Sequence, residues 1–304
     1  MYKDKRGMLL YILPAFILMT VFVFFPIILN FVYSLYRWSA FSDGKVFIGL
    51  ENYVKMFSDE NILISLKNNT WYAIVSVICQ CGLGLVLAAV FESTKMRKFQ
   101  PFFRTLYFIP SVISITVIGL LWQFLYSPTM GVVNPFLKAI GLGSLARDWL
   151  GGASTAMGSV IFVSQWQNIG YIMLLFIIAI QKIPEDIFES ARIDGVNPFT
   201  NFFYIIVPQV TDTVLVTVVT TIIGAFKVFG EVYVMTGGGP GHATEVLAAY
   251  LYKAGFRNDE MGYAAAIATL TFLILLVLTL VQMKINQGPK EPKAPKVKKV
   301  KEAA

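Results

Sequence analysis

Long stretches without a charged residue constrain the fold of this chain more than any other feature. The hydrocarbon core of a bilayer is about 30 Å thick, so a helix needs about 20 apolar residues to cross it. Five runs free of Asp, Glu, Lys and Arg are long enough: 7–36, 68–91, 105–137, 149–181 and 261–283. Pro and Gly residues near one end of the third and fourth runs shorten those predicted helices to 105–127 and 157–181.

A sixth segment, 213–234, completes the set, although it contains Lys227 and Glu231. Six helices place both ends of the chain on the same side of the membrane. The sequence therefore predicts an all-α polytopic membrane protein with six transmembrane helices in one domain, residues 1–285. The segment 286–304 is rich in Lys and Pro and cannot bury an apolar face, so we expect a disordered tail there.

Composition excludes several classes of protein. Only 14% of the residues are charged and the mean hydropathy is +0.66, whereas a soluble domain has about a quarter of its residues charged. These values exclude a disordered protein and argue against a cytosolic enzyme. Two cysteines, Cys79 and Cys81, and one histidine, His242, are too few for a disulfide framework or a zinc module. We therefore expect no metal site and no catalytic residue in the chain.

The distribution of Lys and Arg indicates the orientation. With a cytoplasmic N-terminus, 16 of these residues fall in inner segments, 8 fall in outer segments, and Lys227 stays in the membrane. Positive charge is enriched in cytoplasmic loops, so both termini are predicted to be cytoplasmic. The net charge of +7 fits a membrane surface better than a nucleic acid, because the cations are spread over loops and chain ends. The tail either lies over anionic lipid or serves only as a solubilising end.

The predicted cytoplasmic segment 182–208 has the pattern of two short helices. Pro184 suits the first helical position, and two carboxylates follow it at the positive end of the helix dipole. Gly195 is the expected left-handed stop, and Asn197 caps a second helix that opens with Pro198. Four carboxylates against two cations disfavour the alternative of a helix lying among lipid headgroups. We interpret the segment as a docking site for a cytoplasmic partner.

The same segment resembles the EAA loop of ABC importer permeases. The family pattern is Glu-Ala-Ala, three residues, Gly, nine residues, Ile, one residue and Leu-Pro. The matching residues here, at the same spacing, are Glu189, Ser190, Ala191, Gly195, Ile205, Val207 and Pro208. Ser190 replaces Ala and Val207 replaces Leu. Other stretches are similar to the maltose-type, binding-protein-dependent sugar permeases, namely 49–53, 183–203, 226–229, 233–240 and 261–266.

This resemblance implies a type I permease subunit of an ABC importer in a bacterial cytoplasmic membrane. In such importers two homologous permease chains, expected here as a heterodimer, each receive one cytoplasmic ATPase subunit on the EAA loop. An extracellular solute-binding protein delivers the carbohydrate, which crosses by alternating access coupled to ATP hydrolysis. The residues that the motif assigns to ATPase coupling are Glu189, Ser190, Ala191, Asp194, Gly195 and Pro198.

No cofactor is expected in this chain, because the resemblance assigns ATP and Mg²⁺ to the ATPase partners. The sequence has no Gly-x-x-x-x-Gly-Lys-Ser/Thr loop, which a phosphate cradle of that kind requires. The glycine-rich stretch 237–241 falls in a predicted outer loop with no helix start or lysine behind it. We interpret it as a tight backbone turn.

Polar and aromatic residues of the fourth helix fit a sugar pathway. A sugar site needs amides for the hydroxyl groups and aromatic faces for the ring, and buried amides are costly in hydrocarbon. The candidates, which the family resemblance also places in the pore region, are Gln165, Gln167, Asn168 and Tyr171. The alternative is an outer aromatic belt in which the Tyr171 ring only anchors the helix.

Lys227 and Glu231 of the fifth predicted helix are two further candidates for the substrate path. Because they are four residues apart, they can pair on one helix face. Lys227 also lies near the outer end of the helix, where its side chain can reach the interface. A structural ion pair and a pore-lining role both fit this pattern.

Two other classes of function compete with an ABC importer. A secondary transporter or channel for a small polar solute needs no ATPase, but it usually shows internal repeats or carboxylates along an ion path. Glu231 is the one acidic residue well inside a predicted helix, and the two halves show no convincing repeat. A membrane-embedded enzyme needs convergent catalytic groups, which the sequence lacks. Binding to a cytoplasmic ATPase separates the importer from both alternatives.

Overall fold

The structure, a computed structural model, describes residues 5–41, 44–93 and 96–285, with side chains from residue 11 onward. The predicted tail 286–304 lies outside the described residues. Within them the regular secondary structure is helical apart from one antiparallel hairpin, in which β1 (Tyr36–Arg37) pairs with β2 (Val46–Phe47). Five helical stretches are long and apolar enough to cross a membrane, or six if one bent pair counts as a span. This agrees with the predicted all-α membrane fold.

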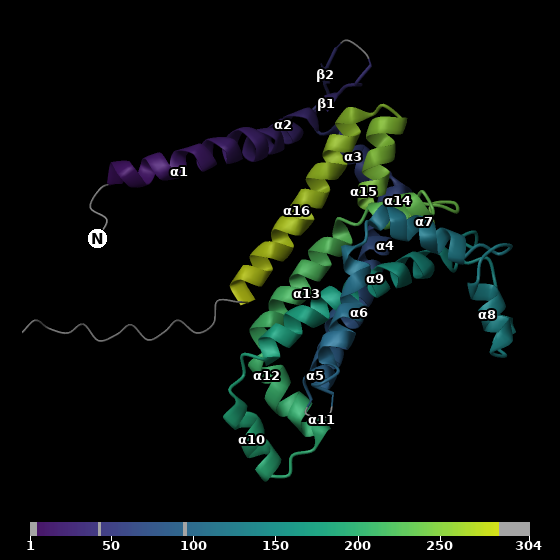
Figure 1. Cartoon of the computed structure of the whole chain (residues 1–304). Helices are drawn as coiled ribbons and strands as arrows, with labels where there is room; N and C mark the ends of the chain where they lie inside the picture. Colours follow the sequence, from purple (N-terminus) through teal and green to yellow (C-terminus); the bar gives the residue numbers. More distant parts are fainter. Residues whose placement is uncertain (1–4, 42–43, 94–95, 286–304) are drawn as a thin grey trace, which may run out of the picture.

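The first span lies at the edge of the molecule and runs away from the other helices (Figure 1). Its parts are α1 (Lys5–Met19), the π-helical segment η1 (Thr20–Phe24) and α2 (Phe25–Tyr33). No residue in its most apolar window is buried in this chain. The span is held at its outer end by the last helix, α16 (Met261–Ile285), because the Asn30 side chain donates to the Ala265 carbonyl at 3.2 Å and to the Thr269 hydroxyl at 3.1 Å.

The centre of the molecule is α9 (Ala156–Ile180), in which 56% of the most apolar window is buried. The second span packs along it and consists of α4 (Glu60–Ser76), the π-helical segment η2 (Val77–Leu83) and α5 (Gly84–Glu92). The two helices cross closely, since a methyl group at Gly84 would touch the Ile172 side chain at 3.4 Å. Both spans match the predicted runs, although the second begins eight residues earlier than the charge-free stretch.

The third predicted span is not one helix. It consists of α6 (Gln100–Val112) and α7 (Ile115–Leu125), which meet at an angle of 97°, so the prediction of a single helix over 105–127 is wrong. Pro110 lies in the last turn of α6, where it removes one backbone donor. The chain is extended at Ile113, with ψ of 139°, and this residue ends the helix.

The fifth predicted span is interrupted as well. Its inner part is α13 (Thr211–Phe226), and a break at Lys227–Phe229 separates it from α14 (Gly230–Met235). Gly230 packs against Ile115 at the start of α7, where an added methyl group would lie 3.0 Å from the Ile115 side chain. The break therefore brings two interrupted spans together near the outer side.

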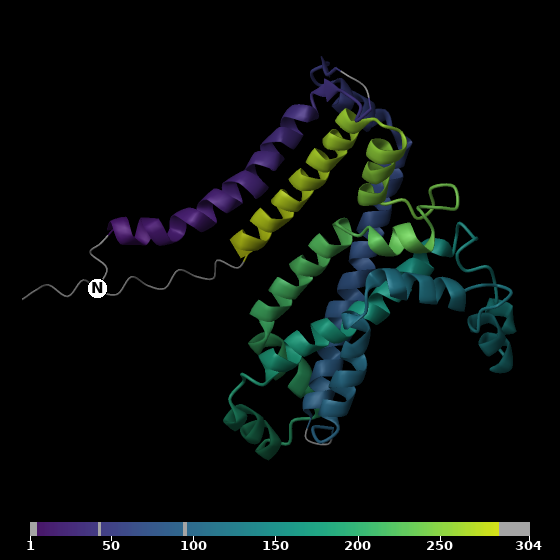
Figure 2. The same cartoon turned by 45° about the horizontal axis from the view of Figure 1, so that its top comes forward.

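Short helices complete both ends of the molecule (Figure 2). The set within the segment predicted to be cytoplasmic is α10 (Glu185–Ile193), α11 (Pro198–Thr200), η4 (Asn201–Ile206) and α12 (Val207–Gln209). The outer set is α3 (Glu51–Ser58), α8 (Val133–Ala139), η3 (Gly143–Leu145), α15 (Leu247–Tyr252) and η5 (Lys253–Arg257). Two apolar clusters form the core, one around Val160, Val232 and Leu247 and one around Leu85, Phe176 and Ile177.

The close crossing of α6 and α9 gives a test of the fold. At Gly170 a methyl group would overlap the backbone of Tyr107, whereas at Gly158, also in α9, nothing lies within 4 Å. We expect Gly170→Ala to lower the free energy of unfolding by about 2 kcal/mol, because backbone atoms must move apart. Gly158→Ala should be neutral or stabilising by up to about 1 kcal/mol. Thermal unfolding in detergent compares the two variants, and equal stability would contradict the crossing.

Candidate functional site

A polar cavity of about 420 Å³ lies between the second span, α9 and the α13–α14 break. The residues that line it come from three elements: Tyr72, Ser76 and Gln80; Ser164, Asn168, Tyr171 and Ile172; Thr220, Thr221, Gly224, Ala225, Lys227, Val228, Phe229, Gly230 and Glu231. Hydroxyls and amides alternate here with two tyrosine rings and a phenylalanine ring. This mixture suits a ligand that has both hydroxyl groups and an apolar face.

The structure divides the four predicted α9 residues into two pairs. Asn168 and Tyr171 line the cavity, whereas Gln165 and Gln167 are not among its lining residues and are each 7% exposed. Gln165 lies behind the cavity wall: its amide donates to the Ser76 hydroxyl at 3.1 Å, and its carbonyl accepts from the Gln80 amide at 2.9 Å. Gln165 therefore holds two lining residues in place without lining the cavity itself.

Gln167 supports the bent third span. Its amide nitrogen donates to the Ile113 carbonyl at 3.1 Å, at the point where the chain leaves α6. In the hydrocarbon of a membrane, an unpaired backbone carbonyl lowers the stability of the folded chain by several kcal/mol. Gln167 supplies this donor and thereby stabilises the 97° bend between α6 and α7.

Lys227 and Glu231 both line the cavity, in line with the pore-lining role that was one of the two alternatives for them. The helix ends at Phe226 and restarts at Gly230, so the two side chains are not on one continuous helix face. Among the ion pairs of the described residues there is none between them. The alternative of a helical ion pair is therefore not found among the described residues, and both residues lie in the cavity wall, with Lys227 exposed and Glu231 half-buried.

Sequence reasoning missed the contribution of the second span. Tyr72, Ser76 and Gln80 follow one another at intervals of four residues, so they lie on one helix face. A stripe of polar residues within an otherwise apolar span is costly unless it faces a cavity or a polar partner. That spacing was the signal that could have identified this wall.

At the end of the molecule that was predicted to be cytoplasmic, α10 and α11 form the predicted pair of short helices. α10 begins at Glu185, and Pro184 precedes the helix instead of occupying its first position. Gly195 has a φ of +69°, and the Val196 amide donates back to the Ala191 carbonyl at 3.0 Å, which closes the helix as predicted. Asn197 accepts from the Thr200 amide at 2.8 Å and so caps α11 ahead of Pro198.

Most of the residues that the motif assigned to ATPase coupling lie on the exposed side of this helix pair. Ala191 is buried, whereas Glu189, Ser190 and Asp194 are exposed. An open groove lies between α10 and η4, and its lining residues are Asp186, Ile187, Ser190, Ala191, Asp194, Val196 and Ile205. Ile193 and Phe199 are 87% and 69% exposed at the tip. Large apolar side chains next to carboxylates on a protruding loop are typical of a protein contact surface.

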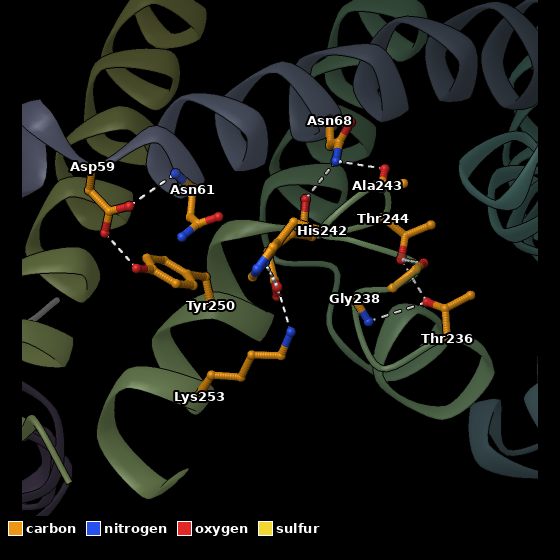
Figure 3. Close-up of polar contacts among 12 residues, drawn as sticks. Asp59, Asn61, Asn68, Thr236, Gly238, His242, Ala243, Thr244, Tyr250 and Lys253 are labelled. Atoms are coloured by element: carbon orange, nitrogen blue, oxygen red, sulfur yellow. Dashed lines mark hydrogen bonds and ion pairs between the residues drawn. The ribbon is translucent and has the colours of Figure 1, made fainter. Parts of the chain in front are cut away.

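At the opposite end of the molecule, an ion cluster around one buried carboxylate fixes the glycine-rich loop (Figure 3). The Glu245 side chain is completely buried, and its Oε2 accepts from Lys253 Nζ at 2.5 Å and lies 3.0 Å from His242 Nδ1. Gly238, with a φ of +89°, lies directly against this pair, so any side chain there would collide with the carboxylate. The predicted tight turn at 237–241 is thus built around a buried ion pair.

Two neighbouring asparagines of α4 connect the outer loop to the cavity. Asn68 donates to the Ala243 and Glu245 carbonyls at 3.1 and 2.8 Å. Asn69 is fully buried and donates to the Ala225 carbonyl at 2.8 Å, while its own carbonyl accepts from the Leu247 amide at 2.9 Å. It therefore caps the end of α13 and the start of α15 with one side chain.

Asp59 forms a second outer junction, just before α4 (Figure 3). Its carboxylate accepts from the Tyr250 hydroxyl at 2.5 Å, the Tyr263 hydroxyl at 2.6 Å and the Asn61 amide at 2.9 Å. Burial opposes ionisation, but these hydrogen bonds outweigh it and hold the pKa of Asp59 below its ordinary value of 3.8. One carboxylate thus ties α4, α15 and α16 together.

This chain is similar to known proteins. The family described as "Binding-protein-dependent transport system inner membrane component" matches residues 80–289. The probable ABC transporter permease protein YurN of Bacillus subtilis is 52% identical, over 93% of this chain and 96% of the relative. The trehalose/maltose transport system permease protein MalF of Thermococcus litoralis is 30% identical, over 94% and 95%. A chain of a bacterial alginate ABC transporter, crystallised with an alginate pentasaccharide-bound periplasmic protein, has the same fold, with a TM-score of 0.81, 22% identity and coverage of 93% and 95%.

The different positions of Gln167 and Asn168 give the next prediction. Gln167→Ala removes the donor of the Ile113 carbonyl, so we expect the free energy of unfolding to fall by about 1–2 kcal/mol. Asn168→Ala should change stability much less, because this side chain adds a bond to a Ser164 carbonyl within its own helix. Thermal unfolding in detergent distinguishes them, and a larger loss for Asn168→Ala would contradict the assignment.

The low pKa of Asp59 predicts a pH dependence. A carboxyl group whose pKa is depressed by folding stabilises the folded state above its ordinary pKa, and this contribution disappears as the pH falls through the folded pKa. We expect the wild type to lose stability between about pH 5 and about pH 3. Asp59→Asn should be less stable at neutral pH by about 2 kcal/mol and should lose less on acidification. Parallel acid profiles for the two proteins would contradict the role of Asp59.

Proposed function

Given that this chain belongs to the family of binding-protein-dependent transport system inner membrane components, we propose that it takes up a carbohydrate through the polar cavity. It is a permease subunit of an ABC importer and not an enzyme. Membership of this family also rejects the alternative of a secondary transporter or channel that works without an ATPase.

The observation that carries the proposal of a sugar substrate is the lining of the cavity. Asn168, Gln80 and Thr220 offer amide and hydroxyl groups to a polyhydroxylated ligand, while Tyr72 and Tyr171 offer ring faces. The volume of about 420 Å³ is within the range of small-molecule sites. The trehalose/maltose permease that this chain resembles supports the same class of substrate.

The coupling of transport to ATP is the second part of the proposal. We assign the contact with a cytoplasmic ATPase subunit to the exposed face of α10, where Glu189 and Ser190 lie beside the open groove. A carboxylate in this position can pair with a basic side chain of the ATPase and set the register of the contact. ATP and Mg²⁺ are held by two such subunits, one on this chain and one on a second, homologous permease chain that completes a heterodimer.

The orientation and the extracellular partner follow from the same arrangement. The count of 16 inner and 8 outer cations supports an orientation with both termini and α10 in the cytoplasm of a bacterial cell. The cavity then lies nearer the outer side, beneath the rigid loop around Glu245. A solute-binding protein delivers the sugar to this side, and hydrolysis at the opposite side opens the cavity inward.

An uptake assay tests the proposal. The chain is co-purified with its partner permease, ATPase and binding protein and reconstituted in proteoliposomes, and ATP-dependent uptake of radiolabelled maltose, trehalose, lactose and maltotriose is measured. We expect uptake of at least one sugar and none without ATP. Asn168→Ala should reduce the uptake rate about fivefold, the equivalent of one lost hydrogen bond, while the complex stays intact. Failure to import any of these sugars would overturn the proposed substrate class.

Matched variants test the coupling assignment. Glu189→Ala should weaken ATPase binding by about 2 kcal/mol, roughly thirtyfold, and Gly195→Val should act similarly by straining a left-handed residue. Gly49→Val and Glu60→Ala are the controls: Gly49 also has a positive φ with nothing within 4 Å, and Glu60 is an exposed carboxylate, both on the outer side. ATPase recovery in the purified complex is the measurement. If the controls lose as much ATPase as the coupling variants, α10 is not the contact.

A further inference from the structure

Four aromatic rings form a continuous series that starts at the cavity and ends on the outer surface. The ring of Phe229 stacks on Tyr233, with centroids 5.0 Å apart and planes inclined by 21°. Tyr252 touches both of them, at 5.5 and 5.1 Å. It then stacks on Phe256 at 5.3 Å with an inclination of 30°. We call Phe229, Tyr233, Tyr252 and Phe256 the aromatic series.

Helical spacing explains why these rings meet. Phe229 and Tyr233 are four residues apart across the start of α14, and Tyr252 and Phe256 are four residues apart across α15 and η5. α14 and α15 lie side by side at the outer side of the molecule in both Figures 1 and 2. The contact of Tyr252 with Tyr233 joins the two pairs into one path.

The exposure of the rings is not that of a packed core. Phe256 is 65% exposed, and the other three rings are half-buried. Phe229, at the inner end, is part of the cavity wall together with Lys227 and Glu231. A belt of aromatic residues that only anchors a protein at the lipid interface would face the lipid headgroups, whereas this series leads into a polar cavity.

We propose that the aromatic series is a binding path for pyranose rings between the outer surface and the cavity, a role that rests on the proposed uptake of sugars. A pyranose ring has an apolar face of C–H groups, which stacks on an aromatic face, and a rim of hydroxyls. Neighbouring rings already touch one another at centroid distances of about 5 Å, so the sugar binds to their free faces and edges and moves along the series without being fully rehydrated. The hydroxyls of Tyr233 and Tyr252 provide polar partners for the rim.

Replacement of the rings by leucine tests this path, because leucine keeps an apolar side chain but offers no flat face. The variants are Phe256→Leu and Tyr252→Leu, compared with Phe256→Tyr and Tyr252→Phe, which retain the ring. Phe57→Leu is the matched control, since Phe57 is an outer residue, 81% exposed, that is not in the series. The exposed position of Phe256 ensures that at least this variant folds.

The measured quantity is the number of sugar molecules imported per ATP hydrolysed by the reconstituted complex, with maltose, trehalose, lactose and maltotriose as probes. A purely structural defect lowers transport and hydrolysis together, whereas loss of the path lowers only the ratio. We expect the leucine variants to lower the ratio about fivefold, the equivalent of one lost ring contact, and the aromatic exchanges and Phe57→Leu to stay within about twofold of wild type.

Each outcome of this experiment decides something different. If the leucine variants keep the wild-type ratio, or if the aromatic exchanges lower it as much as leucine does, stacking is not the function of these rings and the inference is overturned while sugar uptake stands. If the wild type imports none of the four sugars, the proposed function fails and the aromatic path falls with it. A fivefold drop confined to the leucine variants supports the path.

Discussion

The hydrogen-bonding requirement of the backbone in a bilayer determines where this structure can bend. No water is present in the hydrocarbon to satisfy a free carbonyl or amide, so an interrupted helix persists only where protein groups replace the missing bonds. The two interruptions, at Ile113 and at Lys227–Phe229, meet this condition through side-chain amides. Gln167 donates to the Ile113 carbonyl, and Asn69 donates to the Ala225 carbonyl. Without these two side chains, the interrupted spans would have a higher free energy in the bilayer than straight helices.

The interruptions are also what creates the site. Where α13 stops, Lys227 and Glu231 leave the regular helix and become part of a wall, and the second span opposes them with Ser76 and Gln80. Because Asn69 also accepts from the Leu247 amide, the same residue that caps α13 holds the first turn of α15. The outer loop, the cavity wall and the second span are therefore fixed relative to one another by a single buried amide.

The sequence predicts the positions of most spans and the helix pair of segment 182–208, because both depend on local signals. Charge-free runs locate five of the spans, and Gly195 and Asn197 mark helix ends by their own backbone and side-chain chemistry. The interruptions were not predicted, because Pro110 and Gly230 each occur within runs that remain apolar, and the compensating amides are distant in sequence. Gln167 contacts the third span and Asn168 lines the cavity because of how α9 is rotated about its own axis relative to the neighbouring helices. The sequence pattern of α9 alone does not define this rotation. The polar stripe of the second span, formed by Tyr72, Ser76 and Gln80, could have been recognised from its four-residue spacing.

The junction between Asn30 and the last helix has a consequence for biosynthesis. The first span emerges from the ribosome long before Ala265 and Thr269, which accept hydrogen bonds from its Asn30 side chain, have been translated. Until then an amide stays unsatisfied in lipid on a span that has no buried face in this chain. The contact between the two ends of the chain therefore forms last. A ribosome that stalls before codon 265 leaves a product whose first helix is not held by α16. In a chain that ends before residue 265, the Asn30 amide has neither of these two acceptors.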